Sequence, residues 1–452
     1  MNDAPESIPQ AAPGEHRSPA DTLGFLDLLR QNRNYRFAWT GQLVSEIGDH
    51  FNNIAVFSLA LATTRSGLVV SGVMLARAIP AVLAGPLAGV ALDRLNRRTI
   101  MITSDLIRAL VAVLFILTVH QSKPWLLYVL SGLLMFASPF FSSGRAAILP
   151  TIANPRELHT ANSLTQTTQW TTTTIGTLLG GFSAARFGYD AAFVLNAMSF
   201  LFSAWAISRI RLPEGPPRAA LPPMTEANVM RPFKEYAEGL RYMRSRPLLL
   251  AIALLGVGWA SGGGAAQILF SLFGEIVFNR GPAGIGIIWA SAGFGLIIGG
   301  AVAHRLGPRL SFAAYKRTVA ICYLVHGASY VLFSQSQRFG VALFWIGLSR
   351  AAIAISSVLN WSLLLRHVDN AFRGRVFATN ESLVWATMML SMLAAGLASQ
   401  TYDTRAIGAV AGLVSSMTAL YWFWADRAGL LVEPAAHGVD PDDLEVRTEV
   451  RA

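Results

Sequence analysis

The sequence has few charged residues and almost no cysteine. Asp, Glu, Lys and Arg make up 14% of its 452 residues, whereas 53% are hydrophobic and the mean hydropathy is +0.45. A soluble globular domain carries roughly 25% charged residues, so this composition excludes that class and indicates a membrane protein. The single cysteine, Cys322, excludes a disulfide framework and a cysteine-based metal cluster. It lies in an apolar run, where we expect it to pack.

Common enzyme motifs are also absent. The chain has three lysines, and none belongs to a G-x-x-x-x-G-K-[ST] loop, so ATP-driven transport by this chain is excluded. None of the eight histidines begins H-E-x-x-H, and no G-x-S-x-G occurs. We therefore expect no enzyme activity, no cofactor and no metal site.

Long apolar runs are what the sequence does contain. A membrane-spanning helix needs about 20 apolar residues, and the runs do not alternate as the strands of a barrel would. The sequence predicts an all-α membrane protein with twelve spans near 37–63, 68–92, 99–119, 125–150, 160–185, 191–210, 248–278, 283–303, 312–334, 340–364, 376–400 and 406–426.

The net charge of +10 is distributed unevenly between the loops. Basic residues cluster in alternate connections, as at Arg94, Arg97 and Arg98, whereas the remaining connections hold one each. This is the positive-inside pattern, so both termini are predicted to be cytoplasmic and no nucleic-acid partner is needed to explain the charge. The first 36 residues lack the features of a signal peptide.

The two halves of the sequence repeat each other. "GVALDRLNRR" at 89–98 matches "GAVAHRLGPR" at 300–309, and "GRAA" at 144–147 matches "SRAA" at 349–352. We expect two six-helix bundles and the following organisation: a cytoplasmic tail over 1–36, bundles over 37–210 and 248–426, a cytoplasmic linker with an amphipathic helix over 211–247, and a cytoplasmic tail over 427–452.

The pattern G-x-x-x-D-R-x-N-R-R between spans two and three resembles the signature loop of the major facilitator superfamily. Asn96 stands where that family usually has glycine, and asparagine tolerates a left-handed backbone. Within the superfamily, the stretches "GQLVSEIGDHFNNIA", "SDLIRA", "RPFKEYAEGLRYMRSRPLL" and "RGRVFA" are similar to the bacterial macrolide-efflux and enterobactin-exporter branch.

This resemblance implies a fold and a function. The fold is two pseudo-symmetric six-helix bundles in a bacterial inner membrane, and the chain is expected to be a monomer whose partners are the lipid bilayer, a small-molecule substrate and protons. The implied function is secondary export of amphipathic small molecules, with proton antiport by alternating access.

The resemblance also assigns roles in the signature loop. Asp93 is expected to contact the start of span eleven and to latch the outward-open state. Gly89 is expected to allow close packing of span two, while Arg94, Arg97 and Arg98 pair with acids or lipid phosphates. Alternatively, the arginines only anchor the loop on the inner leaflet.

Charged residues inside the spans are costly and point to function. A polar stripe on span one follows helical spacing, and its two acids lie near the depth of Arg77 on span two, with which either could pair. That pair is either a structural ion pair or a site coupled to protons or substrate. The stripe comprises Gln42, Glu46, Asp49 and Asn53.

Two further pairs of charged residues lie in the spans, one related by helical spacing and one by the repeat. Asp105 and Arg108 have the i, i+3 spacing of a local helical pair. Arg145 and Arg350 are equivalent in the two halves, and we expect Arg350 to be the cavity residue.

Spans five, seven and eleven carry the remaining candidates. "GTLLGG" with Gly176, Gly180 and Gly181 resembles the antiporter motif G-P-x-x-G-G, with Thr177 in place of proline; close helix packing is the alternative. Substrate contact or ordinary packing would explain the other stripes, which comprise Gln166 and Gln169 on span five, Gln267 and Glu275 on span seven, and Glu381, Trp385, Met388 and Met392 on span eleven.

The cargo stays open. Arg77 and Arg350 would favour an anionic siderophore or lysophospholipid, and Glu46, Asp49 and Glu381 would favour a cationic drug. A function of another class, a non-transporting membrane receptor or scaffold, would not need buried titratable residues on a polar stripe.

Overall fold

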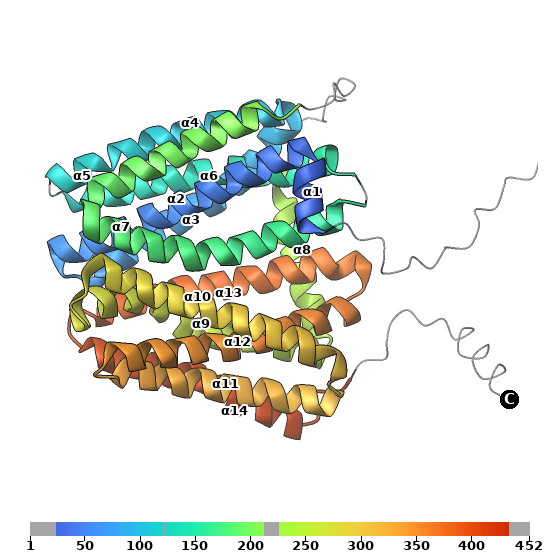
Figure 1. Ribbon diagram of the computed structural model, residues 1–452. Helices are drawn as coiled ribbons and strands as arrows, with labels where there is room; N and C mark the ends of the chain where they lie inside the picture. The colour runs from blue at the N-terminus through green and yellow to red at the C-terminus, as the bar shows by residue number, and fades with distance from the viewer. Residues whose placement is uncertain (1–23, 122, 155, 212–225, 434–452) are drawn as a thin grey trace, which may run out of the picture.

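The computed structural model describes residues 24–433 apart from 122, 155 and 212–225, and these residues form helices with no strand. Most helices run along one direction, in two groups that lie above and below each other in Figure 1. The colour changes from green to yellow between the groups, so each group is one continuous half of the chain. The prediction of an all-α protein with two bundles is confirmed.

Ten helices of the described chain are long and apolar enough to cross a membrane. One of them, Thr160–Ser208, is broken at Gly188, where φ is +82°, and therefore crosses twice. A further helix, Arg33–Thr64, is too polar to be counted among the ten, but its 32 residues span about 48 Å at 1.5 Å per residue. A bilayer core is about 30 Å thick, so the twelve predicted spans are present.

The N-terminal bundle contains the first six spans, and the short helix α5 continues α4 as the end of one span. Its helices are α2 (Arg33–Thr64), α3 (Gly67–Arg94), α4 (Arg97–Leu114), α5 (Ile116–Gln121), α6 (Pro124–Ile152) and α7 (Leu158–Ser208).

Two helices, α1 (Phe25–Gln31) and α8 (Glu226–Arg244), lie outside both bundles. The C-terminal bundle contains the other six spans. The bundle consists of α9 (Pro247–Leu272) with the π-helix η2 (Phe273–Val277), α10 (Gly281–Leu306) with the 3-10 helix η3 (Gly307–Arg309), α11 (Phe312–Gln335), α12 (Phe339–His367), α13 (Asn370–Ala398) and α14 (Thr404–Arg427).

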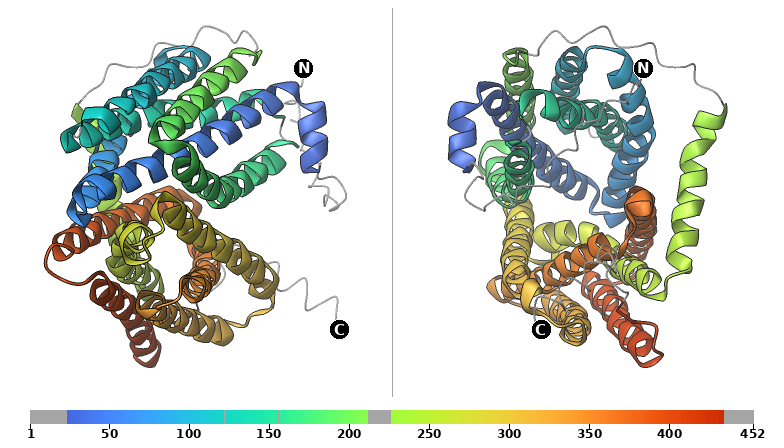
Figure 2. Two further views of the ribbon diagram at one scale, coloured as in Figure 1. Left: turned by 60° about the vertical axis from the view of Figure 1, so that its left-hand side comes forward. Right: turned by 90° about the vertical axis from the view of Figure 1, so that its right-hand side faces the viewer.

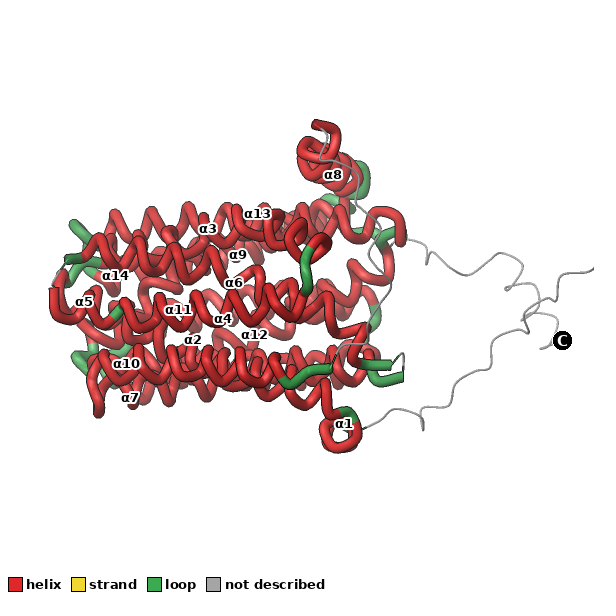
Figure 3. The backbone as a smooth tube through the Cα atoms, turned by 90° about the horizontal axis from the view of Figure 1, so that it is seen from above, coloured by secondary structure: helices red, strands yellow, loops and turns green. Residues whose placement is uncertain are grey.

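The two ends of the molecule differ. We call one the α8 end, because α1 and α8 both lie there, and the opposite one the α5 end (Figures 1 and 3). Figure 2 (right) looks on to the α8 end, where α8 lies along the outside of the bundles and packs against α13.

The bundles close on each other at the α5 end. Gly181 of α7 and Gly286 of α10 approach so closely that a methyl group on either would overlap the other's backbone. The Ser58 hydroxyl donates across the interface to Glu275 Oε2 at 2.6 Å, and the Ser71 hydroxyl donates to the carbonyl of Met392 at 3.1 Å. These contacts join α2, α3 and α7 to the other bundle.

At the α8 end the same helices lose this close packing. Nothing in the described chain lies within 4 Å of a Cβ placed at Gly89 or at its repeat counterpart Gly300. Val82 and Leu83, on the same half of α3, are 67% and 63% exposed. The expected close packing at Gly89 is therefore wrong for this conformation, because this face of α3 contacts no other described helix there, whereas Ala88 beside it is fully buried.

Candidate functional site

A cavity of about 400 Å³ lies between the two bundles. This is within the size range of small-molecule sites. Its walls come from seven spans of both halves and are largely aromatic and thioether side chains, which suit varied apolar ligands. We call it the apolar cavity; its lining includes His50, Asn53, Ile54, Phe57, Met74, Arg77, Met135, Thr173, Thr177, Gln267, Trp289, Trp385, Met389 and Met392.

The apolar cavity lies on the α8 side of the closed α5 end. Gly181 and Gly286 meet one helical turn beyond Thr177, which lines it, and Ser58 follows the lining residue Phe57 on α2. The contacts between the bundles therefore separate the apolar cavity from the α5 end.

A second, polar cavity of about 230 Å³ adjoins it, and Met135 lines both. This acidic cavity holds Glu46 and Asp49 together with Arg108 and Arg145. Glu46 accepts hydrogen bonds from Gln42 Nε2 at 2.7 Å and from the Thr172 hydroxyl at 2.8 Å. The N-terminal bundle alone supplies these residues.

Arg108 compensates two carboxylates at once. Its guanidinium is paired with Asp105 on the same helix and lies 3.9 Å from Asp49 Oδ2 on α2. The group also lies over the rings of Phe141 and Phe200, with centroid distances of 4.7 and 4.3 Å, which adds cation–π attraction. The local pair between Asp105 and Arg108 is confirmed.

The expected pairing of Arg77 with Asp49 or Glu46 is wrong. Asp49 lies beside Arg108 instead, because the long Arg108 side chain reaches from α4 to α2. Arg77 points to the apolar cavity, where its Nη2 lies 3.9 Å from the Met135 sulfur. The position of Arg77 along its predicted span gave a depth in the membrane similar to that of Asp49. It could not give the direction in which the Arg77 side chain points from α3.

The cavities continue towards the α8 end along α2. A third one, of about 80 Å³, shares Gln42 and Arg145 with the acidic cavity and reaches Tyr35 and Trp39. The polar stripe of α2 thus lines a row of connected spaces, with Asn53 in the apolar cavity and Glu46 and Asp49 in the acidic one.

The repeat-related arginines are placed opposite to expectation. Arg145 lines the acidic cavity, whereas Arg350 is 6% exposed and packs over the ring of Phe270 at 5.1 Å, away from the cavities described. Phe270 in turn packs against the rings of Tyr330 and Phe333, so aromatic side chains surround this arginine in place of a cavity.

Some of the polar residues predicted on spans five, seven and eleven line a cavity, and others do not. Gln169 lines the acidic cavity, and Gln267 and Trp385 line the apolar one. Gln166 and Glu381 are exposed and line neither, while Met388 is buried, with Gly264 packed against its backbone. Met389, one residue on, lines the apolar cavity instead. The spacing thus predicted the correct face of α13 but named Met388 where the neighbouring methionine lines the cavity.

The span-five glycines make close helix contacts. Gly176 and Gly180 face His50 and Phe51 of α2. Gly181 faces Gly286 of the other bundle. Thr177 donates to the carbonyl of Thr173 at 2.7 Å and lines the apolar cavity, so a hydroxyl occupies the place of the proline in the antiporter motif.

The signature loop is held by backbone contacts. Asn96 has φ −67° and caps α4 by accepting from the amide of Arg98 at 3.0 Å, so the expected left-handed turn is wrong. Arg97 donates to the carbonyl of Ala147 at 2.5 Å and Arg98 to that of Ser208, at the end of α7. Arg97 and Arg98 thus donate to backbone carbonyls at the ends of neighbouring helices, while Asp93 and Arg94 are exposed.

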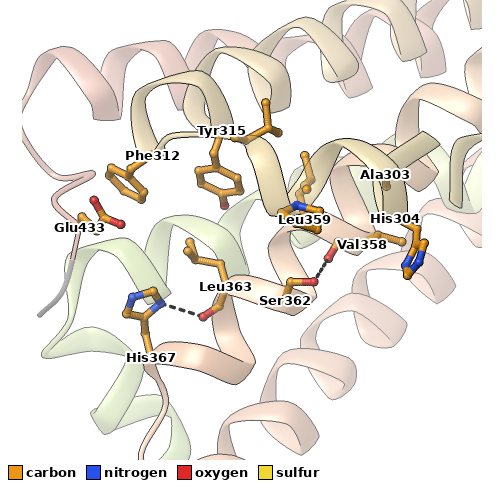
Figure 4. A pocket seen from close by; sticks show the side chains of 13 residues that line it. Ala303, His304, Phe312, Tyr315, Val358, Leu359, Ser362, Leu363, His367 and Glu433 are labelled. Atoms are coloured by element: carbon orange, nitrogen blue, oxygen red, sulfur yellow. Dashed lines mark hydrogen bonds between the residues drawn. The ribbon is translucent and has the colours of Figure 1, made fainter. Parts of the chain in front are cut away.

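A separate cavity of about 190 Å³ lies inside the C-terminal bundle at the α8 end (Figure 4). It contains His304, the repeat counterpart of Asp93, with Tyr315, His367 and Glu433 around it. The Ser362 hydroxyl donates to the carbonyl of Val358 at 2.8 Å, so it is satisfied within its own helix. Because α10, α11 and α12 of one bundle enclose it, this cavity has no wall from the N-terminal bundle.

Several lining residues escaped sequence reasoning. Trp289 and Met135 are single residues in apolar runs, and neither has a polar stripe to mark its face. His50 follows Asp49 directly and could have been noticed as a titratable residue in a span. Arg145 was recognised as an intramembrane charge, but its cavity position depends on how α6 packs against α2.

The sequence matches the Major Facilitator Superfamily over residues 38–379. It is 24% identical over 351 residues to BacE of Bacillus subtilis, named as a bacilysin exporter, covering 78% of this chain and 85% of that one. It is 23% identical over 363 residues to macrolide efflux protein A of Streptococcus pyogenes, covering 79% and 87%.

Solved structures share the fold. A bacterial homologue of the human lysosomal transporter Spinster, in an inward-facing and unoccupied conformation, superposes with a TM-score of 0.66 at 15% identity, covering 90% of this chain and all of that one. A bacterial homologue of the iron transporter ferroportin, in an inward-facing state, gives 0.61 at 18% identity, covering 86% and 98%.

Proposed function

The chain belongs to the Major Facilitator Superfamily, and on this premise we propose that it exports amphipathic small molecules from a bacterial cell by alternating access, with inward proton movement. The apolar cavity between the two bundles carries this proposal. Its aromatic and thioether walls suit an amphipathic ligand, and both halves contribute to it, so rocking of the halves would change its access.

The direction follows from orientation. Arg94, Arg97 and Arg98 lie at the α8 end, and the positive-inside rule places that end, with α8 and both tails, in the cytoplasm. With the α5 end closed, the structure is then an inward-facing state in which cargo would enter from the cytoplasm. Relatives named for macrolide efflux and bacilysin export support outward movement.

Coupling to protons is assigned to the acidic cavity. Asp49 is partly buried beside a guanidinium that it shares with Asp105, so the stability of its ionised form depends on the position of Arg108. A small movement of α4 relative to α2 would change that distance. Glu46, held by Gln42 and Thr172, is the second carboxylate on the route towards the α8 end.

The signature loop and the span-five glycines would control the exchange of states. Asp93 ends α3, and α3 packs against α13. In the outward-open state Asp93 would meet the free amides and positive dipole at the start of α13. Gly181 would have to separate from Gly286 in that state.

An efflux assay tests the proposal. Cells expressing the protein are loaded with fluorescent amphipaths that are cationic, neutral or anionic, with and without a protonophore. We expect efflux that the protonophore abolishes and that Asp49→Asn reduces at least tenfold. Asp190→Asn, at an acid that is 45% exposed and paired with His120, is the matched control and should retain efflux.

Different outcomes select different functions. Efflux that persists with the protonophore at matched surface expression would contradict proton coupling. Selective efflux of anionic probes would favour the alternative on the same fold, an exporter of a siderophore or a flippase of lysophospholipids. Ligand binding without flux would favour a receptor or scaffold.

A further inference from the structure

We propose that Arg77 is an anion-binding residue in the apolar cavity, and that the cargo is therefore an amphipath with one anionic group, such as a carboxylate. That the bound anion is the transported substrate rests on the proposed function. Binding of the anion itself can be tested without transport.

Arg77 lacks a carboxylate partner in the described part of the chain. Among the described residues its Nη1 is buried without a hydrogen-bond partner, and its Nη2 donates to the Met135 sulfur at 3.9 Å. Asp49 acts on it electrostatically, but no ion pair within 4.0 Å joins them, and Asp49 lies beside Arg108 instead. A guanidinium in such surroundings is costly unless a partner satisfies it.

The other arginines near the site are compensated differently. Arg108 is paired with Asp105 and lies near Asp49, and Arg145 lines the acidic cavity, where Glu46 acts on it. Arg350 faces aromatic rings away from the cavities. Arg77 is the one arginine among those lining the apolar cavity, so a ligand there would be its partner.

The rest of the apolar cavity matches a ligand with one charged end. Phe57, Trp289, Trp385 and Met392 present apolar surface, whereas polar contacts are few. The Asn53 Oδ1 and the Trp289 Nε1 are buried without partners in the described structure, so an acceptor and a donor are available for neutral polar atoms of the ligand.

The lining of the apolar cavity also disfavours a cation. Arg77 is the one Asp, Glu, Lys or Arg side chain that the described chain contributes to that lining, whereas Glu46 and Asp49 line the adjoining acidic cavity. There Asp49 lies near Arg108, which is also paired with Asp105. A cationic ligand in the apolar cavity would meet Arg77 with no carboxylate in the described lining to offset the repulsion.

Three probes with one aromatic body test the inference: dansylglycine, an anion; dansylamide, which is neutral; and dansylcadaverine, a cation. Binding to the full chain in nanodiscs is read as dansyl emission excited through tryptophan, with empty nanodiscs as background. We expect dansylglycine to bind about tenfold more tightly than dansylamide, and dansylcadaverine to bind most weakly. A tenfold difference corresponds to about 1.4 kcal/mol, the order of one hydrogen bond to a charged group.

Variants identify the residue. Arg77→Met should bring the affinity for dansylglycine down about tenfold, to that for dansylamide, whereas Arg77→Lys should retain the anion preference. Arg186→Met removes an exposed arginine and should change neither affinity. If Arg77→Met does not fold, the order of the three probes on the wild type and on Arg77→Lys still decides.

The result that overturns the inference is tight binding of dansylcadaverine relative to dansylglycine, an anion preference that survives in Arg77→Met, or no binding of any probe. A preserved anion preference in a protein without proton-driven efflux would leave the inference standing and reject the proposed function alone.

Discussion

Arg108 balances the buried charge of the N-terminal bundle. It is 3% exposed, while its partner Asp105 is fully buried and Asp49 is 26% exposed. The i, i+3 spacing predicted one of these contacts from sequence, because it needs only a helix. The contact of Arg108 with Asp49 depends on how the spans are arranged in space. Positions along the predicted spans therefore suggested Arg77, not Arg108, as the partner of Asp49.

Loss of Arg108 should destabilise the protein strongly. Arg108→Met would leave Asp105 fully buried and Asp49 partly buried without their cation, and breaking a buried pair such as Asp105 with Arg108 costs about 3 to 5 kcal/mol. We expect a large fall in the thermal unfolding midpoint of purified protein. Arg108→Lys should lose less, because the charge remains. Arg186→Met is the control, and an equal loss there would show that net charge, not the buried cluster, is responsible.

The helix α8 is attached to the start of α13. The Tyr242 hydroxyl donates to Asp369 Oδ2 at 2.9 Å, and its ring stacks on Phe372 at 4.6 Å. Glu238 and Arg375 form an ion pair at 2.9 Å. The sequence predicted an amphipathic helix in the linker. An amphipathic pattern does not identify the helix against which it packs, so the contact with α13 could not be predicted.

Removing the Tyr242 hydroxyl should loosen α8. In Tyr242→Phe the ring stack remains, but the hydroxyl's donation to Asp369 Oδ2 and its acceptance from the Asp369 amide are both lost, each worth about 1 kcal/mol. Amides of residues 238–244 should then exchange at least about fivefold faster. Tyr402→Phe, at a side chain that is 68% exposed, should not change exchange there. Equal exchange in Tyr242→Phe and wild type would mean that stacking alone holds α8.

The same contact should be insensitive to pH near neutrality. Burial raises the pKa of Tyr242 above its ordinary value of 10.0. The neutral hydroxyl is favoured in the docked state, so its contribution is complete below pH 10 and is lost only as the pH rises through the raised pKa.

The whole molecule is closed at one end, and sequence could not predict which. Composition, loop charges and the repeat predicted twelve spans in two bundles, because each signal is local or periodic. The choice between closed ends is an equilibrium between two packings of the same helices. Contacts such as Gly181 with Gly286 exist in one packing only, so the sequence specifies both states without ranking them.

A disulfide across the α5 end should trap this state. A Cβ on Gly67 of α3 would lie 3.0 Å from the Cβ of Ser399, which follows α13. This is about 0.5 Å below the range found in disulfides, so a small separation of the two backbones would allow the bond. The native Cys322 is buried and gives little background. Gly67→Cys with Ser399→Cys should cross-link on oxidation and lose transport at least tenfold, and dithiothreitol should restore it. Transport by the fully cross-linked protein would show that the α5 end need not open, and each single variant is the control.

The polar character of α2 has a consequence for biosynthesis. Glu46 and Asp49 make this helix poorly hydrophobic, and each central acid costs roughly 2.5 to 3.5 kcal/mol on an insertion scale. Their partners, Arg108 on α4 and Thr172 on α7, follow later in the chain. The ribosome therefore delivers α2 before anything can neutralise it. The residues that would move protons in the finished transporter make α2 depend, during synthesis, on the translocon or a membrane chaperone until α4 and α7 arrive.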